Sequence, residues 1–149
     1  PEVFARCRVE NGKTDAVNRL VAQSKDYEME QAGVAGEFGF CLVTDQPFTK
    51  LNLGDSGIDP GYDIEINGVK IDVKCSPHPR SRYLIVTEVH PIVDVYVGAR
   101  ANLEQKTVEF FGWITAGEFT LAQDPFPHGS GDPSVLFKQL HPFNEAPWL

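Results

Sequence analysis

The sequence lacks three features that would each place it in a familiar class of protein. It has no uninterrupted run of about 20 apolar residues, the length that a membrane-spanning helix needs, so we expect no membrane span. It has three cysteines, an odd number spread far apart, which argues against a disulfide framework and favours a reducing compartment. It also lacks a basic excess, because 13 Lys and Arg residues stand against 21 Asp and Glu residues. The resulting net charge of −8 argues against a protein that coats nucleic acid nonspecifically.

The residues that are present suffice for one domain. The chain has 149 residues, a usual domain length, and 42% of them are hydrophobic, which allows one buried core. No signal peptide is recognisable. We expect a single domain over residues 1–149, with its core over about 13–121. Five of the eleven prolines follow residue 123, so residues 122–149 are expected to form an irregular tail in which only 135–140 can pack.

The negative charge is concentrated in one segment. Residues 26–72 contain ten acidic and two basic residues, so this segment alone accounts for the net charge of −8. Two explanations stay open at this point. The acidic residues form a solvated face, which is the commoner case, or some of them form a site with a chemical task.

The hydrophobic pattern changes its period along the chain. Helical spacing predicts a helix over 13–43 with a break near 25–26, and its glycines at 33, 36 and 39 indicate a face that another element approaches closely. Alternating patterns then predict a series of strands, with 83–89 and 93–99 at the centre of the sheet. The expected strands cover 62–66, 69–75, 83–89, 93–99 and 107–113, and a short helix covers 114–121. This order predicts an α/β (α+β) fold with a mixed sheet flanked by helices.

The strongest local signal is a hairpin whose turn is Asn67-Gly68. A two-residue turn sets the register of both strands, and this register places Asp63 opposite Asp72. Like charges opposite one another destabilise a sheet, so such a pair is expected where function requires it. Two close carboxylates suit a hard divalent cation, and Lys74 points to the same face. The alternative is an exposed hairpin whose aspartates turn into the solvent.

Other candidate residues have weaker support. Cys75 and His78 are zinc-type ligands, but no second pair lies at metal-ligand spacing. Asp55 and Asp59 are either turn formers or residues that support the site, with turn formation the commoner role. Tyr83 and His90 are candidates to line the site or to be buried, and Trp113 and Phe119 are expected in the core.

The motif residues form a recognisable set. Pro60-Gly-Tyr-Asp63, eight further residues and Asp72-Val-Lys74, on a hairpin that follows a helix with Glu37, resemble the PD-(D/E)XK nuclease superfamily. The resemblance covers about residues 30–120. Two residues stretch the Pro-Asp dipeptide, and Cys75 follows Lys74 where some members have a glutamine shortly after the lysine. Gly33, Gly36 and Phe40 crowd the helix face of Glu37, which favours a functional role for its carboxylate over a solvated one.

The resemblance implies a restriction-endonuclease-like fold and a catalytic set of Asp63, Asp72, Lys74 and Glu37. It implies one or two Mg²⁺ (or Mn²⁺) ions held by Asp63 and Asp72, with Glu37 and the backbone carbonyl of Val73 as further ligands. Lys74 would then orient the attacking water or neutralise charge in the transition state.

The same resemblance implies a metal-dependent deoxyribonuclease, most often an endonuclease, that acts in phage or bacterial DNA processing. DNA is the expected partner, a homodimer is a further expectation, and the expected location is the cytoplasm of a bacterial or phage-infected cell. Arg80 and Arg82 follow the motif strand in a stiff basic loop and could meet phosphates, or the loop is a solvated connector. The alternatives are a nuclease-fold module that binds nucleic acid or protein without cutting, and an acidic interaction domain.

Overall fold

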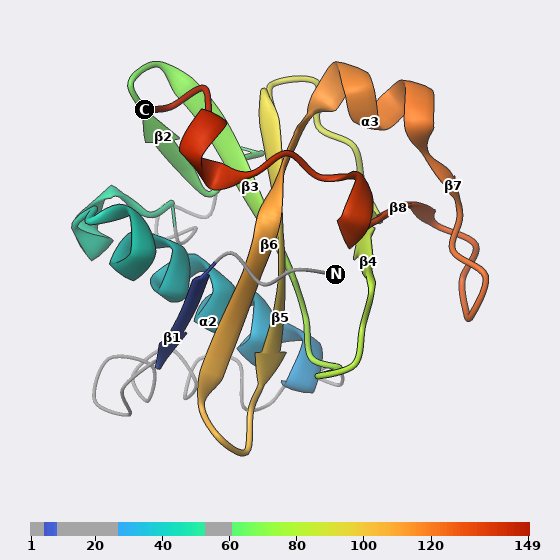
Figure 1. Cartoon of the computed structure of the whole chain (residues 1–149), viewed down its shortest axis with the longest axis horizontal. Helices are drawn as coiled ribbons and strands as arrows, with labels where there is room; N and C mark the ends of the chain where they lie inside the picture. Colours follow the sequence, from blue (N-terminus) through green and yellow to red (C-terminus); the bar gives the residue numbers. More distant parts are fainter. Residues whose placement is uncertain (1–4, 9–26, 53–60) are drawn as a thin grey trace.

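The computed structural model describes residues 5–8, 27–52 and 61–149. Within these residues the chain forms a main sheet of five strands, a small sheet of three strands and two α-helices (Figure 1). The main sheet has the order β1 (Ala5–Arg8), β6 (Thr107–Thr115), β5 (Val95–Asn102), β3 (Val69–Ser76) and β2 (Ile64–Ile66). Because β3 and β5 are parallel and the other neighbours are antiparallel, the sheet is mixed. The predicted α/β class, with a mixed sheet flanked by helices, is confirmed.

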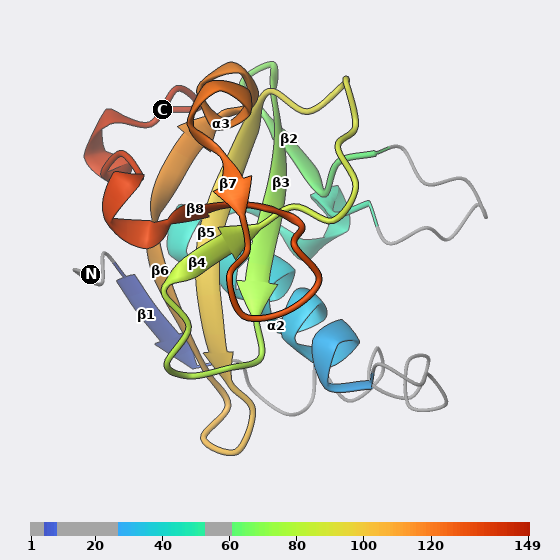
Figure 2. The same ribbon diagram turned by 90° about the vertical axis from the view of Figure 1, so that its right-hand side faces the viewer.

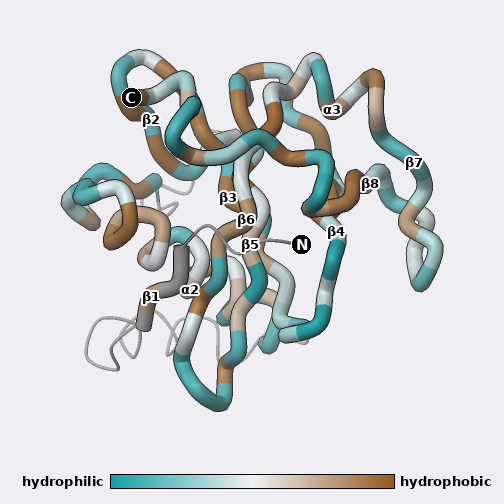
Figure 3. Tube along the Cα trace, viewed as in Figure 1, coloured by the Kyte–Doolittle hydropathy of each residue, from teal (hydrophilic) through white to brown (hydrophobic). Residues whose placement is uncertain are grey.

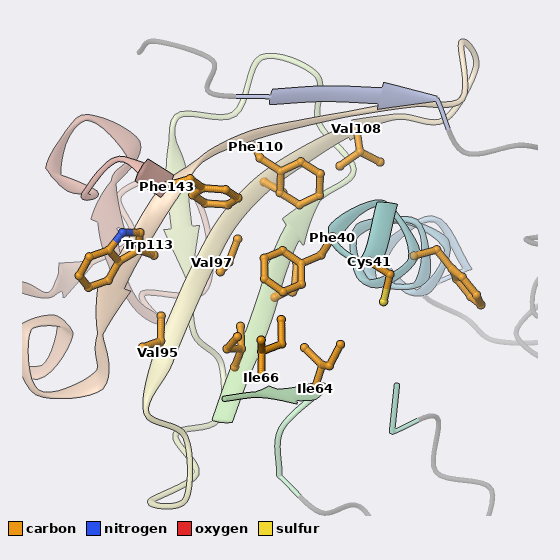
Figure 4. Packing of buried hydrophobic residues seen from close by; sticks show 14 of the residues in the cluster. Phe40, Cys41, Ile64, Ile66, Val95, Val97, Val108, Phe110, Trp113 and Phe143 are labelled. Atoms are coloured by element: carbon orange, nitrogen blue, oxygen red, sulfur yellow. The ribbon is translucent and has the colours of Figure 1, made fainter. Parts of the chain in front are cut away.

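Helix α2 (Tyr27–Thr44) covers one face of the main sheet. Phe40 and Cys41 lie in the core between this helix and the sheet, beside Val97 and Phe110 (Figure 4). The helix ends at Thr44, one residue beyond the predicted end, and the short 3₁₀ turn η1 (Phe48–Lys50) follows it. The predicted helix over 13–26, its break, and the loop aspartates at 55 and 59 lie outside the described residues.

Two of the three helix glycines lie where the sheet comes closest. A Cβ atom on Gly36 would lie 2.5 Å from the Cβ of Cys75, and one on Gly39 would lie 2.9 Å from the Sγ of Cys7. Neither distance leaves room for a methyl group, so a larger residue would push α2 away from the sheet. The predicted close approach is therefore confirmed at these two positions. A Cβ on Gly33 would meet no atom within 4 Å, so packing against the sheet does not explain that glycine.

The opposite face of the main sheet is covered by α3 (Ala116–Ala122) and by the small sheet, whose order is β4 (Tyr83–Ile85), β8 (Pro133–Leu136) and β7 (Asp124–Pro125). A second group of buried side chains, including Tyr96 and Phe119, fills the space between them. The polar turn that joins β5 to β6 extends beyond both layers (Figure 3). The sheet is thus packed on both faces.

The sequence prediction of central strands is half right. Strand β5 lies in the middle of the main sheet, as expected. The prediction for 83–89 is wrong, because β4 has only three residues and pairs with β8 in the small sheet. A strand with few charges must be buried, but covering layers can bury it as well as neighbouring strands can. Strand β1 was not predicted, since a four-residue edge strand leaves little pattern to detect.

The C-terminal segment is more ordered than the irregular tail that the sequence predicts. After β8 it runs through the 3₁₀ turns η2 (Phe137–Gln139) and η3 (Phe143–Glu145). His141 pairs with Trp113 of β6, and beyond it Trp148 is buried on the α2 side of the sheet. The segment therefore passes from one face of the sheet to the other (Figures 1 and 2).

A glycine in β6 permits this crossing. Gly112 has a φ of 147°, and a Cβ there would collide with the backbone oxygen of His141. The expectation that only 135–140 would pack is wrong, because Phe143, Ala146 and Trp148 are also buried. Within the described residues, no helix combines the length and the apolar character that crossing a membrane would require.

Candidate functional site

A cavity of about 680 Å³ opens beside β3, between α2 and the small sheet. One wall contains the acidic residues that the sequence singled out, Glu37, Asp63 and Asp72, together with Lys74. The other wall is made by β4 and by residues 126–132, which connect β7 to β8. Figure 2 shows this connection beside the carboxyl end of β3. The predicted catalytic residues are therefore brought together at one cavity.

Helix α2 contributes one stripe of its surface to this cavity. Met29, Gly33 and Glu37 are spaced four residues apart, which places them on one helix face, and all three line the cavity. Because Gly33 has no side chain, it leaves open space beside Glu37. The close packing of Gly36 on β3 one residue earlier holds Glu37 against the sheet.

The hairpin positions the two aspartates, but not in the predicted way. The turn residues Asn67 and Gly68 have φ angles of 50° and 79°, as a tight hairpin turn requires. The predicted register is confirmed for three pairs, which end at Ile64 opposite Ile71. Beyond this point the register slips by one residue, because the amide of Asp63 donates to the carbonyl of Ile71 at 2.9 Å. The ladder pair between Asp63 and Asp72 does not form.

The slip has a consequence for the Asp63 carboxylate. Its Oδ2 accepts a hydrogen bond from the backbone amide of Val73 at 2.7 Å. The carboxylate thus takes the place that a further residue of β2 would occupy along the edge of β3. The physical reason is that a buried N–H needs an acceptor, and a carboxylate supplies a strong one where the strand ends. Asp63 and Asp72 still meet, but through their side chains.

Asp72 and Lys74, both on β3, form an ion pair. Asp72 is only 7% exposed, and its Oδ2 lies 2.8 Å from the Nζ of Lys74. Burial alone would lower the pKa of Lys74, but the charge and hydrogen bond of Asp72, and then the charge of Asp63, outweigh it and raise this pKa. Lys74 therefore stays protonated at the site.

Asp63 lies among like charges. Its carboxyl group lies close to the side chains of both Glu37 and Asp72. Its pKa is raised well above the usual value, first by burial and then by the negative charges of Glu37 and Asp72. Carboxyl groups that lie this close repel one another when all are ionised, so a proton held by Asp63 or a nearby cation such as Lys74 stabilises them. The electrostatics of the site therefore favour a bound positive charge.

The backbone of β3 adds a carbonyl oxygen to the same edge. In a strand, the N–H and C=O of one residue point to the same side. Because the Val73 N–H points to Asp63, the Val73 carbonyl also points to this edge, beyond the end of β2. This is the carbonyl that the sequence resemblance implies as a ligand.

The buried hydroxyl of Tyr96 borders the acidic wall. Tyr96 is paired with Asp72 across β5 and β3, is 1% exposed, and has no hydrogen-bond partner among the described residues. Burial, followed by the charge of Asp72, raises the pKa of the phenol, so it remains neutral. An unsatisfied buried hydroxyl costs stability, which is a common feature of functional sites.

The carboxylates and the Val73 carbonyl have the chemistry that a hard divalent cation requires, but they are not arranged as a complete coordination site. Carboxylate and carbonyl oxygens are the ligands that Mg²⁺ and Mn²⁺ prefer. In the part of the chain that the structure describes, no three His, Cys, Asp or Glu side chains form a group that could hold a metal ion as they stand. Two of the oxygens are engaged, one by the Val73 amide and one by Lys74. Binding an ion would require these carboxylates to rotate.

Some predicted residues lie away from the cavity. Arg80 and Arg82 are exposed in the loop between β3 and β4 and do not line it, whereas His78 and Ser81 of the same loop do. Arg100 anchors this loop, because its Nη1 donates to the Ser81 carbonyl at 3.1 Å. His90 lies near Gly61 instead of at the cavity.

Sequence reasoning missed the second wall. Tyr83 lines the cavity, which was one of its two proposed roles, and it does so together with Phe126, His128 and Asp132 from the C-terminal segment. No local pattern could have indicated the last three, because pairing between β4 and β8 brings them to the site across more than 40 residues. Trp113 and Phe119 are buried in the core, as predicted.

Comparisons of this chain with protein-family models, with curated proteins and with solved structures found no significant match. We therefore infer the function from the residues of the cavity themselves.

Proposed function

We propose that this protein is a nuclease that depends on a divalent metal ion and hydrolyses phosphodiester bonds of DNA, as an endonuclease in phage or bacterial DNA processing. One observation carries the proposal. Asp63 lies at the edge of β3 where β2 ends, and it meets Glu37 from the helix and Asp72 from the strand at one cavity, with Lys74 beside them.

In this proposal Asp63 and Asp72 would hold Mg²⁺ or Mn²⁺, with Glu37 and the Val73 carbonyl as further ligands. Such an ion supplies a water of lowered pKa and stabilises negative charge on the phosphate. Lys74 contributes a positive charge, because Asp72 keeps its amino group protonated. Its ammonium group can donate hydrogen bonds to a phosphate oxygen or to the attacking water, where negative charge develops in the reaction.

The remaining parts of the proposal follow from this chemistry. One such site cuts one strand, so cleavage of both strands of a duplex would require two copies, and the proposal includes a homodimer on such substrates. The expected location is the cytoplasm of a bacterial or phage-infected cell.

One observation favours a second candidate, a module of the same architecture that binds nucleic acid or a partner protein without cutting. The oxygens Oδ2 of Asp63 and Asp72 are already engaged by Val73 and Lys74. If these contacts persist in solution, the carboxylates serve the fold instead of a metal ion. The complete set of acids and lysine favours the nuclease, since a module that only binds would have no need of it.

A cleavage panel separates the two candidates. Wild type, Asp72→Asn and the control Glu104→Gln, at an exposed turn away from the cavity, are incubated with linear, plasmid, flap and four-way-junction DNA in Mg²⁺, Mn²⁺ or EDTA. We expect cleavage by wild type and by the control with either metal, and at least about a hundredfold loss in Asp72→Asn. Absence of metal-dependent cleavage on every substrate would support the binding module.

Thermal melting tests the metal site without activity. Titration with Mn²⁺ should raise the melting temperature of wild type and of Glu104→Gln, and should change that of Asp72→Asn little. An equal rise in all three proteins would show that the metal binds elsewhere.

A further inference from the structure

The cavity has a second end that the proposed metal chemistry does not use. There Tyr83 from β4 meets Phe126 and His128 from the connection between β7 and β8. The ring centroids lie 5.2 Å apart for Tyr83 and Phe126, 6.2 Å for Tyr83 and His128, and 5.8 Å for Phe126 and His128. We call these three residues the aromatic cluster.

The rings of the aromatic cluster meet edge to face. The angles between their planes are 75°, 78° and 83°. No two of the rings are stacked, so they do not cover one another's faces completely. Tyr83 and Phe126 are half-buried and His128 is exposed, although a cluster of this kind would normally be closed over in a core. The aromatic cluster thus presents ring surface to the cavity.

The backbone holds this cluster in place before any ligand arrives. Tyr83 is on a strand that pairs with β8. The amide of Phe126 donates to the Asp132 carbonyl at 2.8 Å and thereby closes the loop at its base. The Oγ of Ser130 donates to the Asp132 carboxylate at 2.6 Å within the same loop. A surface held in this way binds a ligand without a large ordering cost.

The size and composition of the cavity select the kind of ligand. A volume of about 680 Å³ is typical of a binding site for a small molecule. It has an acidic end suited to a phosphate through a bound cation and an aromatic end suited to a flat ring. A phosphate joined to a base is one nucleotide of a strand, and a base can reach a ring face only after it leaves the stack of a duplex.

We propose that the aromatic cluster stacks on an unpaired base of the nucleic-acid strand whose phosphate lies at the acidic end, so that single-stranded or unpaired nucleic acid is the preferred substrate. This inference rests on the proposed function for the role of the acidic end. It adds a substrate class and assigns a binding role to the C-terminal segment, which supplies two of the three rings.

Binding measured without metal tests the inference apart from cleavage. All the proteins compared share the same acidic end, so its repulsion of the strand cancels and the differences between them report the ring. The fluorescence anisotropy of a labelled single-stranded oligonucleotide is followed in EDTA with wild type, Phe126→Ala, Phe126→Leu and the control Leu121→Ala, whose side chain is exposed on α3 away from the cavity. The same strand annealed to its complement gives the duplex comparison.

We expect wild type and Leu121→Ala to bind the single strand more tightly than the duplex. Phe126→Ala should bind the single strand roughly tenfold more weakly, the loss of one base–aromatic stack. Phe126→Leu should show a similar loss, because leucine keeps the apolar contacts and lacks the ring. Circular dichroism and melting temperature establish that each variant is folded, and Phe126→Leu decides the result if Phe126→Ala does not fold.

Unchanged affinity in a folded Phe126 variant would overturn the inference, and so would a wild type that binds duplex as tightly as single strand. Cleavage of the same oligonucleotide in Mg²⁺ is measured in parallel. If the binding pattern appears as expected while no metal cleaves the strand, the nuclease proposal fails and the aromatic cluster remains a base-binding site. If cleavage occurs and the Phe126 variants bind as tightly as wild type, the nuclease proposal stands and the aromatic cluster is not a base-binding site.

Discussion

The hairpin over 64–76 and the C-terminal segment over 124–149 both line the cavity, yet the sequence predicts only one of them. The hairpin is local: its turn, its register and its buried face all lie within a few neighbouring residues. The C-terminal segment takes its structure from distant partners, because β8 pairs with β4 and His141 pairs with Trp113 of β6. A hydrophobic pattern reports which residues are buried, but not which distant element buries them.

The two regions are also joined directly. The side-chain amide of Asn67, in the hairpin turn, donates to the backbone carbonyl of Trp148 at 2.7 Å. Trp148 in turn contacts the ring of Phe40 on α2, with centroids 5.5 Å apart. The C-terminal segment therefore closes the core that supports the acidic wall. The comparison predicts that damage to either region affects the fold as a whole.

The largest effect is expected from Trp148→Ala. Trp148 is 3% exposed, and removal of such a side chain typically lowers the free energy of unfolding by about 3–5 kcal/mol. Leu149→Ala is the matched control, since Leu149 is 76% exposed and its loss should change stability by less than about 0.5 kcal/mol. Urea unfolding measures both. Equal stability of the two variants would mean that the C-terminal segment is dispensable for the core.

An intermediate effect is expected from alanine at two glycines of α2. Gly36→Ala should destabilise by about 1–3 kcal/mol, because its Cβ would be forced against Cys75. Gly33→Ala should stabilise by up to about 1 kcal/mol, because alanine favours the helix and its Cβ enters open space. Thermal or urea unfolding distinguishes these opposite signs. Destabilisation by both variants would contradict the open space beside Glu37.

The smallest effect is expected from Asp63→Asn in EDTA. The asparagine oxygen can still accept the Val73 amide, while the repulsion from Glu37 and Asp72 is removed, so stability at neutral pH should be unchanged or slightly higher. A loss of more than about 1 kcal/mol would show that the negative charge of Asp63 is paired in the fold.

The pH dependence of that variant supplies a second comparison. In the folded state Asp63 holds its proton to a higher pH than in the unfolded state, whose pKa is near the usual value. Its contribution to stability is therefore complete below about pH 4 and is lost as pH rises through the folded pKa. Wild type should therefore lose more stability than Asp63→Asn as the pH rises from about 4 through the folded pKa of Asp63. Urea unfolding at several pH values measures this. If the free energy of unfolding changes with pH by the same amount in both proteins, the prediction is contradicted.

Much of the acidic wall could be predicted from the sequence. The hairpin turn, the three-pair register and the close approach at Gly36 and Gly39 are confirmed, and Glu37, Asp63, Asp72 and Lys74 do meet. The slip at Asp63 could not be predicted, because it depends on where β2 ends and on the need of the Val73 amide for an acceptor. Register rules describe a continuing ladder and do not say where it stops.

The amino-acid sequence by itself determined the α/β class, the central strand β5 and the acidic set with its lysine, because each depends on periodicity or spacing within short segments. Only the tertiary structure decided that β4 leaves the main sheet, that the C-terminal segment crosses β6 at Gly112, and that Phe126 and His128 face the acids across a cavity. These features depend on contacts between residues far apart in the chain. Their formation is governed by the total burial and pairing of the whole fold, which no single segment encodes.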